Sequence, residues 1–276
     1  MQDINYFAEG STSTGDIRWE PYLEKKIMKY IEQESILRNY VFDYPLPQNT
    51  FVVKIPRNYP TGAAVEVSEG SEIPRVRMPT DTFELSVVKY GTGGEMTDEA
   101  KETDWLGILG REQIDEAARR LLRKENNDIV NVMLTAPQTI LPTTTSLTYE
   151  DIVDLKTKMI KLQTNPDVLF VAPDNYAQLE KDQEFLAASH MSDGMLFREG
   201  VVGRVSGLDV VMVPEIPKDV ALMMDTSLKP VWLVRREGVR IGRMRDEERQ
   251  VDSFFLTMWE KPAVVRPQAL GMITIN

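Results

Sequence analysis

Two kinds of hydrophobic spacing alternate along the chain and predict a mixed α+β protein. Apolar residues return every third or fourth position from Pro21 to about Asn39, from Thr97 or Thr103 to about Lys124, and from Thr148 to Asn165, which predicts amphipathic helices. A short helix is expected after Pro173. Short β-rich runs predict strands at 129–134, 168–171, 201–205, 208–213, 220–224, 231–235, 253–259 and 272–275.

Residues 51–95 have the most unusual pattern. Apolar and polar residues alternate at both ends of this segment, which predicts the two strands of a long ribbon. Its middle is interrupted by Pro60, Gly62, Gly70, Pro74 and Pro79. A two-stranded ribbon is at best marginally stable alone, because it buries little apolar surface. We therefore expect it to lie on another surface, either that of its own domain or that of a neighbouring subunit.

Composition closes several classes of function. The chain has no cysteine, so it can form no disulfide, no thiolate metal site and no cysteine nucleophile. A net charge of -11 argues against a protein whose whole surface grips nucleic acid. Neither a membrane span nor a signal peptide is evident, so we expect a cytoplasmic place of synthesis. The segment 235–249 is rich in arginine and could serve subunit contacts, a phosphate surface or a solvated strand pair.

Candidate catalytic and metal-binding residues are few. His190, near Ser189 and Ser192, is the only histidine, and this grouping is a weak indication of a catalytic triad. The carboxylates that could hold a hard cation are Asp98, Glu99, Glu102, Asp104, Glu247 and Glu248. Their spacing is not that of a calcium loop, and at a helix start the first group suits the helix dipole. We predict no catalytic residue, no metal and no cofactor.

Two further groups have plain structural interpretations. Gly91, Gly93 and Gly94 precede a helix but lack the lysine of a phosphate-binding loop, so we expect a flexible joint between ribbon and helix. The aromatic residues Phe254, Phe255 and Trp259 are expected in the core rather than in a base-stacking platform.

The order of these pieces resembles the major capsid protein of tailed bacteriophages and related archaeal viruses, the Hong Kong 97 fold family. The resemblance covers nearly the whole chain after about residue 50. It rests on the stretches FELSVVKYGTGGEMTDEA, NPDVLFVAPDNYAQL, GRVSGLDVVMVPEIP and FFLTMWEKPAVVRPQALGMITI. The motifs are loose, so their order carries more weight than their letters.

The resemblance implies a division of the chain and a function. Residues 1–50 would form an N-terminal arm, 51–90 an extended loop, 91–145 with 245–276 a peripheral domain with a long spine helix, and 146–244 an axial mixed α/β domain. The protein would assemble with itself into pentamers and hexamers of an icosahedral shell around double-stranded DNA, contacted non-specifically. Portal and scaffolding proteins would be partners, with no membrane involved. It would be assembled in the host cytoplasm and located in the virion.

Two departures from the family bear on how such a shell would be held. Some members weld their shells through a lysine in the extended loop, but no lysine lies between Arg57 and Thr82. Some members begin with a helical scaffolding segment, whereas this sequence starts with a short arm, so a separate scaffolding protein or none is expected. Non-covalent contacts are therefore predicted. The candidate intersubunit residues are Glu66, Glu69, Glu72, Arg75, Arg77, Arg240, Arg243 and Arg245.

Two other functions stay open from the sequence. An encapsulin-like nanocompartment would share the fold and the length but house protein cargo instead of a genome. A metal-dependent α/β enzyme using the acidic residues around Glu99 would be a monomer or a small oligomer, and light scattering would separate it from a shell.

Overall fold

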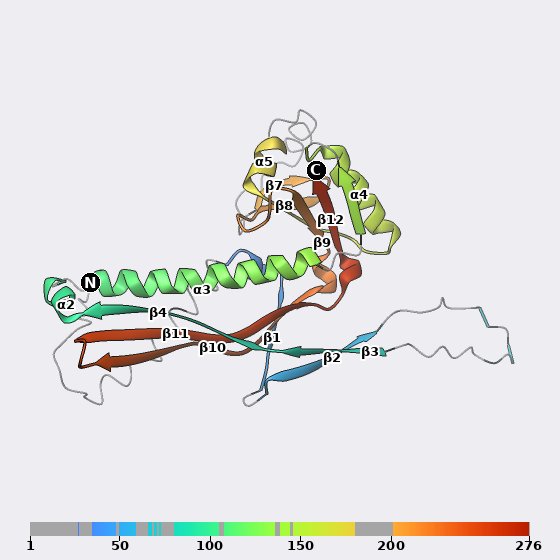
Figure 1. The fold of residues 1–276 in the computed structure, drawn as a ribbon. Helices are drawn as coiled ribbons and strands as arrows, with labels where there is room; N and C mark the ends of the chain where they lie inside the picture. Colours follow the sequence, from blue (N-terminus) through green and yellow to red (C-terminus); the bar gives the residue numbers. More distant parts are fainter. Residues whose placement is uncertain are drawn as a thin grey trace, which may run out of the picture.

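The computed structural model describes most of the chain after residue 34. The described residues are 27, 35–47, 50–58, 66–67, 69–70, 72, 80–104, 108–135, 139–143, 146–179 and 201–275. Two bodies of secondary structure and a projecting ribbon make up these residues (Figure 1). The α+β class predicted from the sequence is confirmed.

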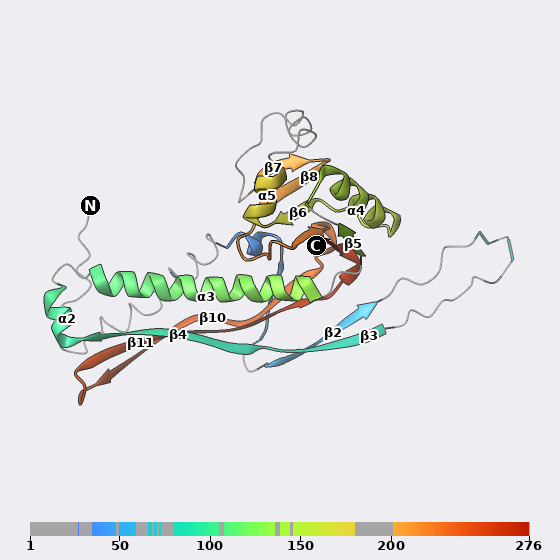
Figure 2. The same cartoon turned by 45° about the horizontal axis from the view of Figure 1, so that its top comes forward.

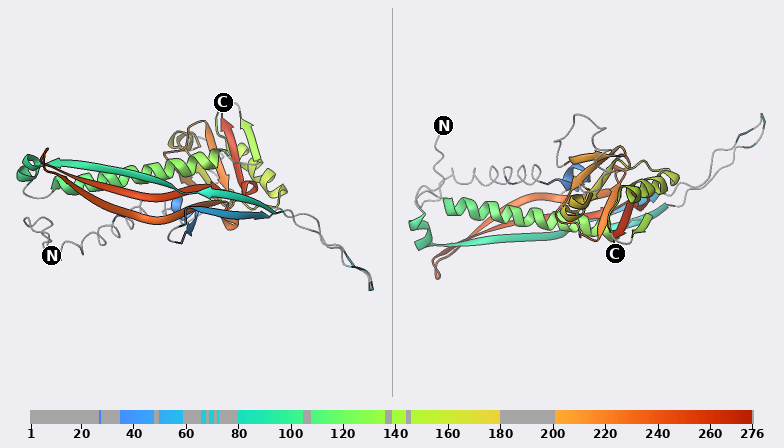
Figure 3. Two further views of the ribbon diagram at one scale, coloured as in Figure 1. Left: turned by 60° about the horizontal axis from the view of Figure 1, so that its bottom comes forward. Right: turned by 90° about the horizontal axis from the view of Figure 1, so that it is seen from above.

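A long sheet and a long helix run side by side through the first body (Figure 3). The sheet has the order β1-β10-β11-β4, with β1 parallel to β10 and the other pairs antiparallel. Its strands are β1 (Phe42–Pro45), β10 (Val231–Asp246), β11 (Val251–Val264) and β4 (Val88–Thr97). Helix α3 (Ile108–Thr135) lies over one face, and the short helix α2 (Asp98–Thr103) joins it to β4.

The apolar stripe of α3 explains why the helix lies on this sheet. Ala117, Ala118 and Leu121 are buried in one cluster with Leu256 and Met258 of β11. Alternate residues of a strand point to opposite faces, so the even-numbered residues of this part of β11 face the helix. The small alanines let the helix approach the strands closely.

The second body is a six-stranded sheet with helices packed against it. Its order is β5-β12-β9-β6-β8-β7, with parallel and antiparallel pairs mixed. The strands are β5 (Thr139–Thr143), β12 (Leu270–Ile275), β9 (Val220–Met224), β6 (Val168–Val171), β8 (Leu208–Met212) and β7 (Val201–Val205). The helices are α4 (Tyr149–Lys161) and α5 (Pro173–Leu179). The short 3-10 turns among the described residues are η2 (Leu37–Asn39), η3 (Thr226–Leu228) and η4 (Pro267–Ala269).

The ribbon is a pair of antiparallel strands that points away from both bodies (Figures 1 and 2). It consists of β2 (Val52–Asn58) and β3 (Thr80–Ser86), paired from Val52↔Ser86 to Asn58↔Thr80. The predicted ribbon was too long at its second end, because residues 88–97 are β4 and pair with β11. That end of the segment therefore belongs to the long sheet.

Most predicted elements are confirmed, with two corrections around the long helix. The predicted strand 129–134 is wrong, since these residues are the last turns of α3. Ile129, Val130 and Met133 have helical spacing and are buried against Phe170 of β6. A short apolar run has no period that separates a strand from a buried helix. The single helix expected from Thr97 is two helices, α2 and α3, and most of the helix expected from Pro21 to Asn39 lies outside the described residues.

Sheet membership also bears on the predicted domain division, which stays a prediction. β5 and β12 belong to the six-stranded sheet, although both lie in segments predicted to be peripheral. All of β10 belongs to the long sheet, although most of it falls in the segment predicted to be axial. No described helix is long and apolar enough to cross a membrane.

Candidate intersubunit surfaces

The base of the ribbon is anchored to the long sheet by a small apolar cluster. Ile55 and Leu85 are buried there with Val234 and Ala263 on the sheet face opposite α3. The aromatic ring of Phe51 lies 5.4 Å from that of Trp259, centroid to centroid. These contacts fix the direction in which the ribbon leaves the body.

The same base leaves an apolar surface open. Phe51 is 45% exposed, and Val52 and Val88 are each 43% exposed. Further along the long sheet, Met244 and Phe255 are exposed as well. The expectation that Phe255 lies in the core is therefore wrong, because the odd-numbered residues here face away from α3, while Phe254 and Trp259 are partly buried. Exposed apolar groups beside a projecting ribbon are typical of a surface that meets a partner.

The acidic candidates of the ribbon are accessible. Glu66, Glu69 and Glu72 are exposed and form no ion pair with another described residue. Arg75 and Arg77 lie outside the described residues. Nearer the base, Lys54 and Glu84 face each other across the strands at 4.0 Å, and both side chains are largely exposed. The three glutamates remain candidates for contact with a neighbour.

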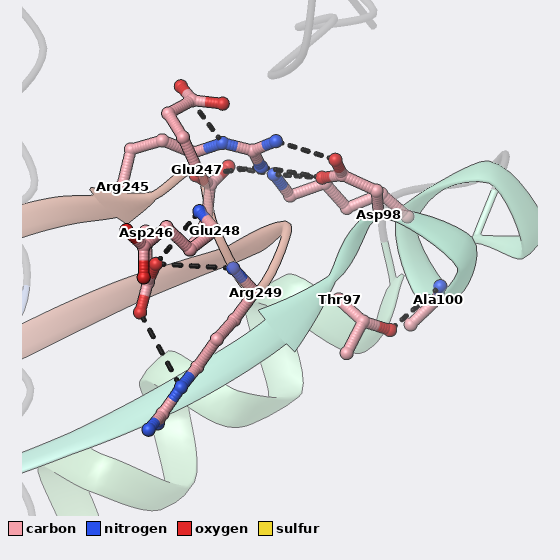
Figure 4. Close-up of polar contacts among 10 residues, drawn as sticks. Thr97, Asp98, Ala100, Arg245, Asp246, Glu247, Glu248 and Arg249 are labelled. Carbon is pink, nitrogen blue, oxygen red and sulfur yellow. Dashed lines mark hydrogen bonds and ion pairs between the residues drawn. The ribbon is translucent and has the colours of Figure 1, made fainter.

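The arginine candidates differ from one another in what they contact. Arg240 donates a hydrogen bond to Glu237 at 3.0 Å, and Arg243 is exposed with no ion pair to another described residue. Arg245 is held within the chain: its guanidinium donates two hydrogen bonds to Asp98, at 2.6 and 2.5 Å (Figure 4). Their contact with a second subunit stays a prediction, and Arg245 has the most extensive contacts inside its own chain.

The Arg245 site joins the tip of the β10–β11 hairpin to the start of α2. Asp252 and Glu247 also approach the guanidinium, at 3.2 and 3.4 Å. The pKa of Asp98 is lowered, chiefly by the hydrogen bonds from Arg245. Thr97 caps α2 by accepting a hydrogen bond from the backbone N–H of Ala100, as the sequence predicts. These contacts connect segments about 150 residues apart in the chain.

Three of the carboxylates considered as metal ligands have other roles in the part of the chain that the structure describes. Asp98 and Glu247 pair with Arg245, and Glu99 lies in the first turn of α2. Among the described residues, no three acidic or histidine side chains gather as metal ligands would. His190, Ser189 and Ser192 lie outside the described residues.

The glycine cluster is part of a strand, so the predicted flexible joint is wrong. Gly91, Gly93 and Gly94 lie in β4 and pair with residues of β11. The rings of Phe254 and Phe255 lie over Gly94 and Gly93, where a Cβ atom would meet them at 2.6 and 3.1 Å. Glycine is required at positions 93 and 94 for close packing between strands rather than for a turn or for binding phosphate.

One buried charged group was missed by sequence reasoning. Arg38 of η2 donates hydrogen bonds to Glu125 of α3 at 2.5 and 2.6 Å, and Glu260 of β11 lies near both. The residues are 87 or more positions apart in the sequence. Arginine and glutamate are usually found on the surface, so nothing in the sequence marks these three as buried. No local pattern could have revealed the group.

A spine helix over a long sheet, a second mixed-sheet body and a projecting ribbon together define the Hong Kong 97-type capsid fold. A family model described as "Phage capsid protein" matches residues 80–274, well over half of the chain. The chain therefore belongs to this family of phage capsid proteins. No match was found among curated protein sequences.

Solved structures confirm the fold. The capsid of the cyanophage P-SCSP1u matches with a TM-score of 0.70 and 11% identity, over 100% of this chain and 93% of that one. The virus-like particle from Pyrococcus furiosus matches with a TM-score of 0.63 and 11% identity, over 92% and 99%. The SrpI encapsulin from Synechococcus elongatus matches with a TM-score of 0.65 and 12% identity, over 97% and 92%. At these identities the likeness shows the fold alone.

Proposed function

We propose that this chain is a viral major capsid protein that assembles into pentamers and hexamers of an icosahedral shell enclosing double-stranded DNA. The observation that carries the proposal is the projecting β2–β3 ribbon, which leaves the body and exposes apolar and acidic groups that its own chain does not cover. A head-to-tail contact of this kind closes into rings when the rotation between subunits permits. The phage capsid family match supports the same conclusion.

In the proposed shell the ribbon is a non-covalent strap across a neighbouring subunit. Its middle has no lysine, so packing, hydrogen bonds and the charges of Glu66, Glu69 and Glu72 would hold it. The long sheet with α3 would form the peripheral domain and the six-stranded sheet the axial domain. Compared with the division expected from the sequence, β5 and β12 are then assigned to the axial domain and all of β10 to the peripheral domain. We assign the strands of one sheet to one domain because their hydrogen bonds hold them together.

The family match also supports our proposals for the remaining partners and for the location. Portal and scaffolding proteins would contact the shell, and the packaged DNA would touch its inner surface without sequence preference. Assembly would take place in the host cytoplasm, and the finished protein would reside in the virion. The arginines at 240 and 243 would serve subunit contacts or the inner surface, because their side chains are exposed.

An encapsulin-like shell is the second candidate. The specific observation in its favour is the fold similarity to the SrpI encapsulin, at a TM-score close to those of the phage capsids. Both functions rest on a closed shell of subunits with this fold, and they differ in what the shell contains.

Electron microscopy of the purified full-length protein tests the proposal. We expect closed particles with pentamers and hexamers. Nucleic acid absorbance in particles from infected cells supports a virus, whereas particles that hold only protein cargo support the encapsulin alternative. A protein that stays a monomer or a small oligomer at high concentration contradicts both.

A further inference from the structure

Three elements of one chain converge on a buried charged group. Arg38 comes from η2, Glu125 from the middle of α3 and Glu260 from β11. Both glutamates are 1% exposed, and the side chain of Arg38 is 10% exposed. The guanidinium holds Glu125 through two hydrogen bonds of 2.5 and 2.6 Å but lies 3.8 Å from the nearer oxygen of Glu260. Arg38 therefore binds the carboxylate of Glu125 closely and that of Glu260 only weakly.

Glu260 lacks the partners that a buried carboxylate needs. Neither of its oxygens accepts a hydrogen bond from a described residue. Arg235, its register partner on β10, is engaged by Asp43 at 2.5 Å. An ionised carboxylate that is buried without hydrogen bonds pays a desolvation penalty that nothing offsets. The ionised form of Glu260 is accordingly disfavoured.

The other groups around Glu260 do not supply a second full partner. Tyr90 of β4 faces it, and beyond Tyr90 lie Asp128 and Lys124 of α3, which pair with each other at 2.7 Å. The pKa of Glu260 is raised well above its ordinary value, first by burial and then by the charge of Glu125, against the opposing charges of Arg38 and Arg235. Two carboxyls that meet in a buried site lower their energy by keeping one proton between them.

We propose that Glu125 and Glu260 share one proton, and that this proton and Arg38 together form a pH-dependent latch that holds residues 37–45 against α3 and β11. Residues 37–45 carry η2 and β1, and β1 is the edge strand beside β10. The latch joins η2 and β1 to the spine helix and the long sheet. It lies within one subunit, so it does not depend on the proposed shell function.

The direction of the pH effect follows from the raised pKa. When the latch opens, Glu260 regains an ordinary glutamate pKa of about 4.3 and loses its proton. Opening becomes easier as the pH rises from that value towards the raised pKa of Glu260 in the closed latch, by up to about tenfold for each pH unit. Above the raised pKa the opening equilibrium is constant. The latch is therefore tighter at mildly acidic pH than at alkaline pH.

Hydrogen exchange of the backbone amides of residues 37–45 tests the latch in the full-length chain. The variant Glu260→Gln keeps the shape of the side chain but cannot titrate. The ratio of wild-type to variant exchange, measured at the same pH, removes the intrinsic pH dependence of exchange. We expect this ratio to rise with pH and then level off. The matched control Glu84→Gln changes a carboxyl that is 61% exposed on the ribbon and should give a ratio that does not change with pH.

Infrared spectroscopy of the wild-type protein tests the shared proton directly. At about pH 6 exposed carboxyls are ionised, so a protonated carboxyl band can come only from a group with a raised pKa. We expect this band in the wild type and its loss in Glu260→Gln. A pH-independent exchange ratio overturns the latch. Absence of the band from the wild-type spectrum overturns the shared proton even if the variant does not fold.

Discussion

Single residues of β4 and β11 show how closely this sheet is packed. An added Cβ on Gly93 would lie 2.5 Å from the carbonyl oxygen of Phe254, and one on Gly94 would lie 2.6 Å from its ring. Phe254 and Phe255 point to opposite faces of the sheet, so each ring covers a different glycine. Glycine normally weakens a strand, because it has no side chain to pack. Here the two rings supply the missing side-chain surface.

Gly93→Ala is expected to destabilise the protein by about 1–3 kcal/mol, because the methyl group would collide with backbone that cannot move without breaking strand pairing. The matched control is Gly242→Ala, on the neighbouring strand β10, where an added Cβ meets no atom within 4 Å. That change should be neutral or should stabilise by about 0.5–1 kcal/mol, because alanine loses less backbone entropy. Urea unfolding of both variants measures the difference. Equal effects at the two positions would contradict the packing argument.

At the scale of elements, local patterns were predicted well and distant pairings were not. Helix α4 begins as the sequence indicates, since Thr148 and Asp151 form a capping box and Ile152, Leu155 and Met159 are buried. All of that information lies within one short segment. The last turns of α3 were mistaken for a strand, because Ile129 to Leu134 is apolar without a clear period.

The candidate site was predictable only in part for the same reason. Exposed carboxylates in the ribbon could be inferred from the prolines and glycines around them. The partner of Arg245 could not be inferred, because Asp98 is 147 positions away in the sequence. The pairing of β4, β11 and β10 brings the two residues together. The group of Arg38, Glu125 and Glu260 was hidden likewise, since only the folded chain brings its members together.

The contact between Arg245 and Asp98 is expected to hold the hairpin tip to α2 in a pH-dependent way. The pKa of Asp98 is lowered in the folded chain, so the contact is fully present above the ordinary aspartate pKa of about 3.9. It is lost as the pH falls through the lowered value. Acidification should therefore raise the hydrogen exchange of residues 246–251 relative to the intrinsic exchange rate at the same pH.

Asp98→Asn tests that contact without changing the size of the side chain. At neutral pH the variant should show faster exchange at the tip than the wild type. Its exchange relative to the intrinsic rate should not change further when the pH is lowered. Glu99→Gln, on the same helix turn, is the control and should behave as the wild type, since Glu99 forms no ion pair with another described residue. High salt should weaken the wild-type contact, because the pair is partly exposed. An unchanged tip in Asp98→Asn would show that strand pairing alone holds it.

The whole molecule consists of two packed bodies and one ribbon that is anchored only at its base. The base of the ribbon is fixed by Ile55, Leu85 and Val234, whereas Glu66 and Glu69 beyond it are exposed. A contact made there with a neighbour would be weak in a single pair, about 0.2–1 kcal/mol for an exposed ion pair. In a closed shell every copy repeats the contact, so small energies add up to a large effect on assembly.

Charge reversal in the ribbon should therefore weaken assembly while leaving the subunit folded. We expect Glu69→Lys to lower the fraction of protein in shells, and the triple change of Glu66, Glu69 and Glu72 to lysine to lower it further. Sedimentation measures that fraction, and circular dichroism checks the fold. Asp154→Lys, an exposed change of the same charge on α4, is the control and should assemble more fully. If the triple variant forms shells as readily as Asp154→Lys, the acidic ribbon does not hold the neighbour, and the apolar base around Phe51 and Val88 becomes the surface to test.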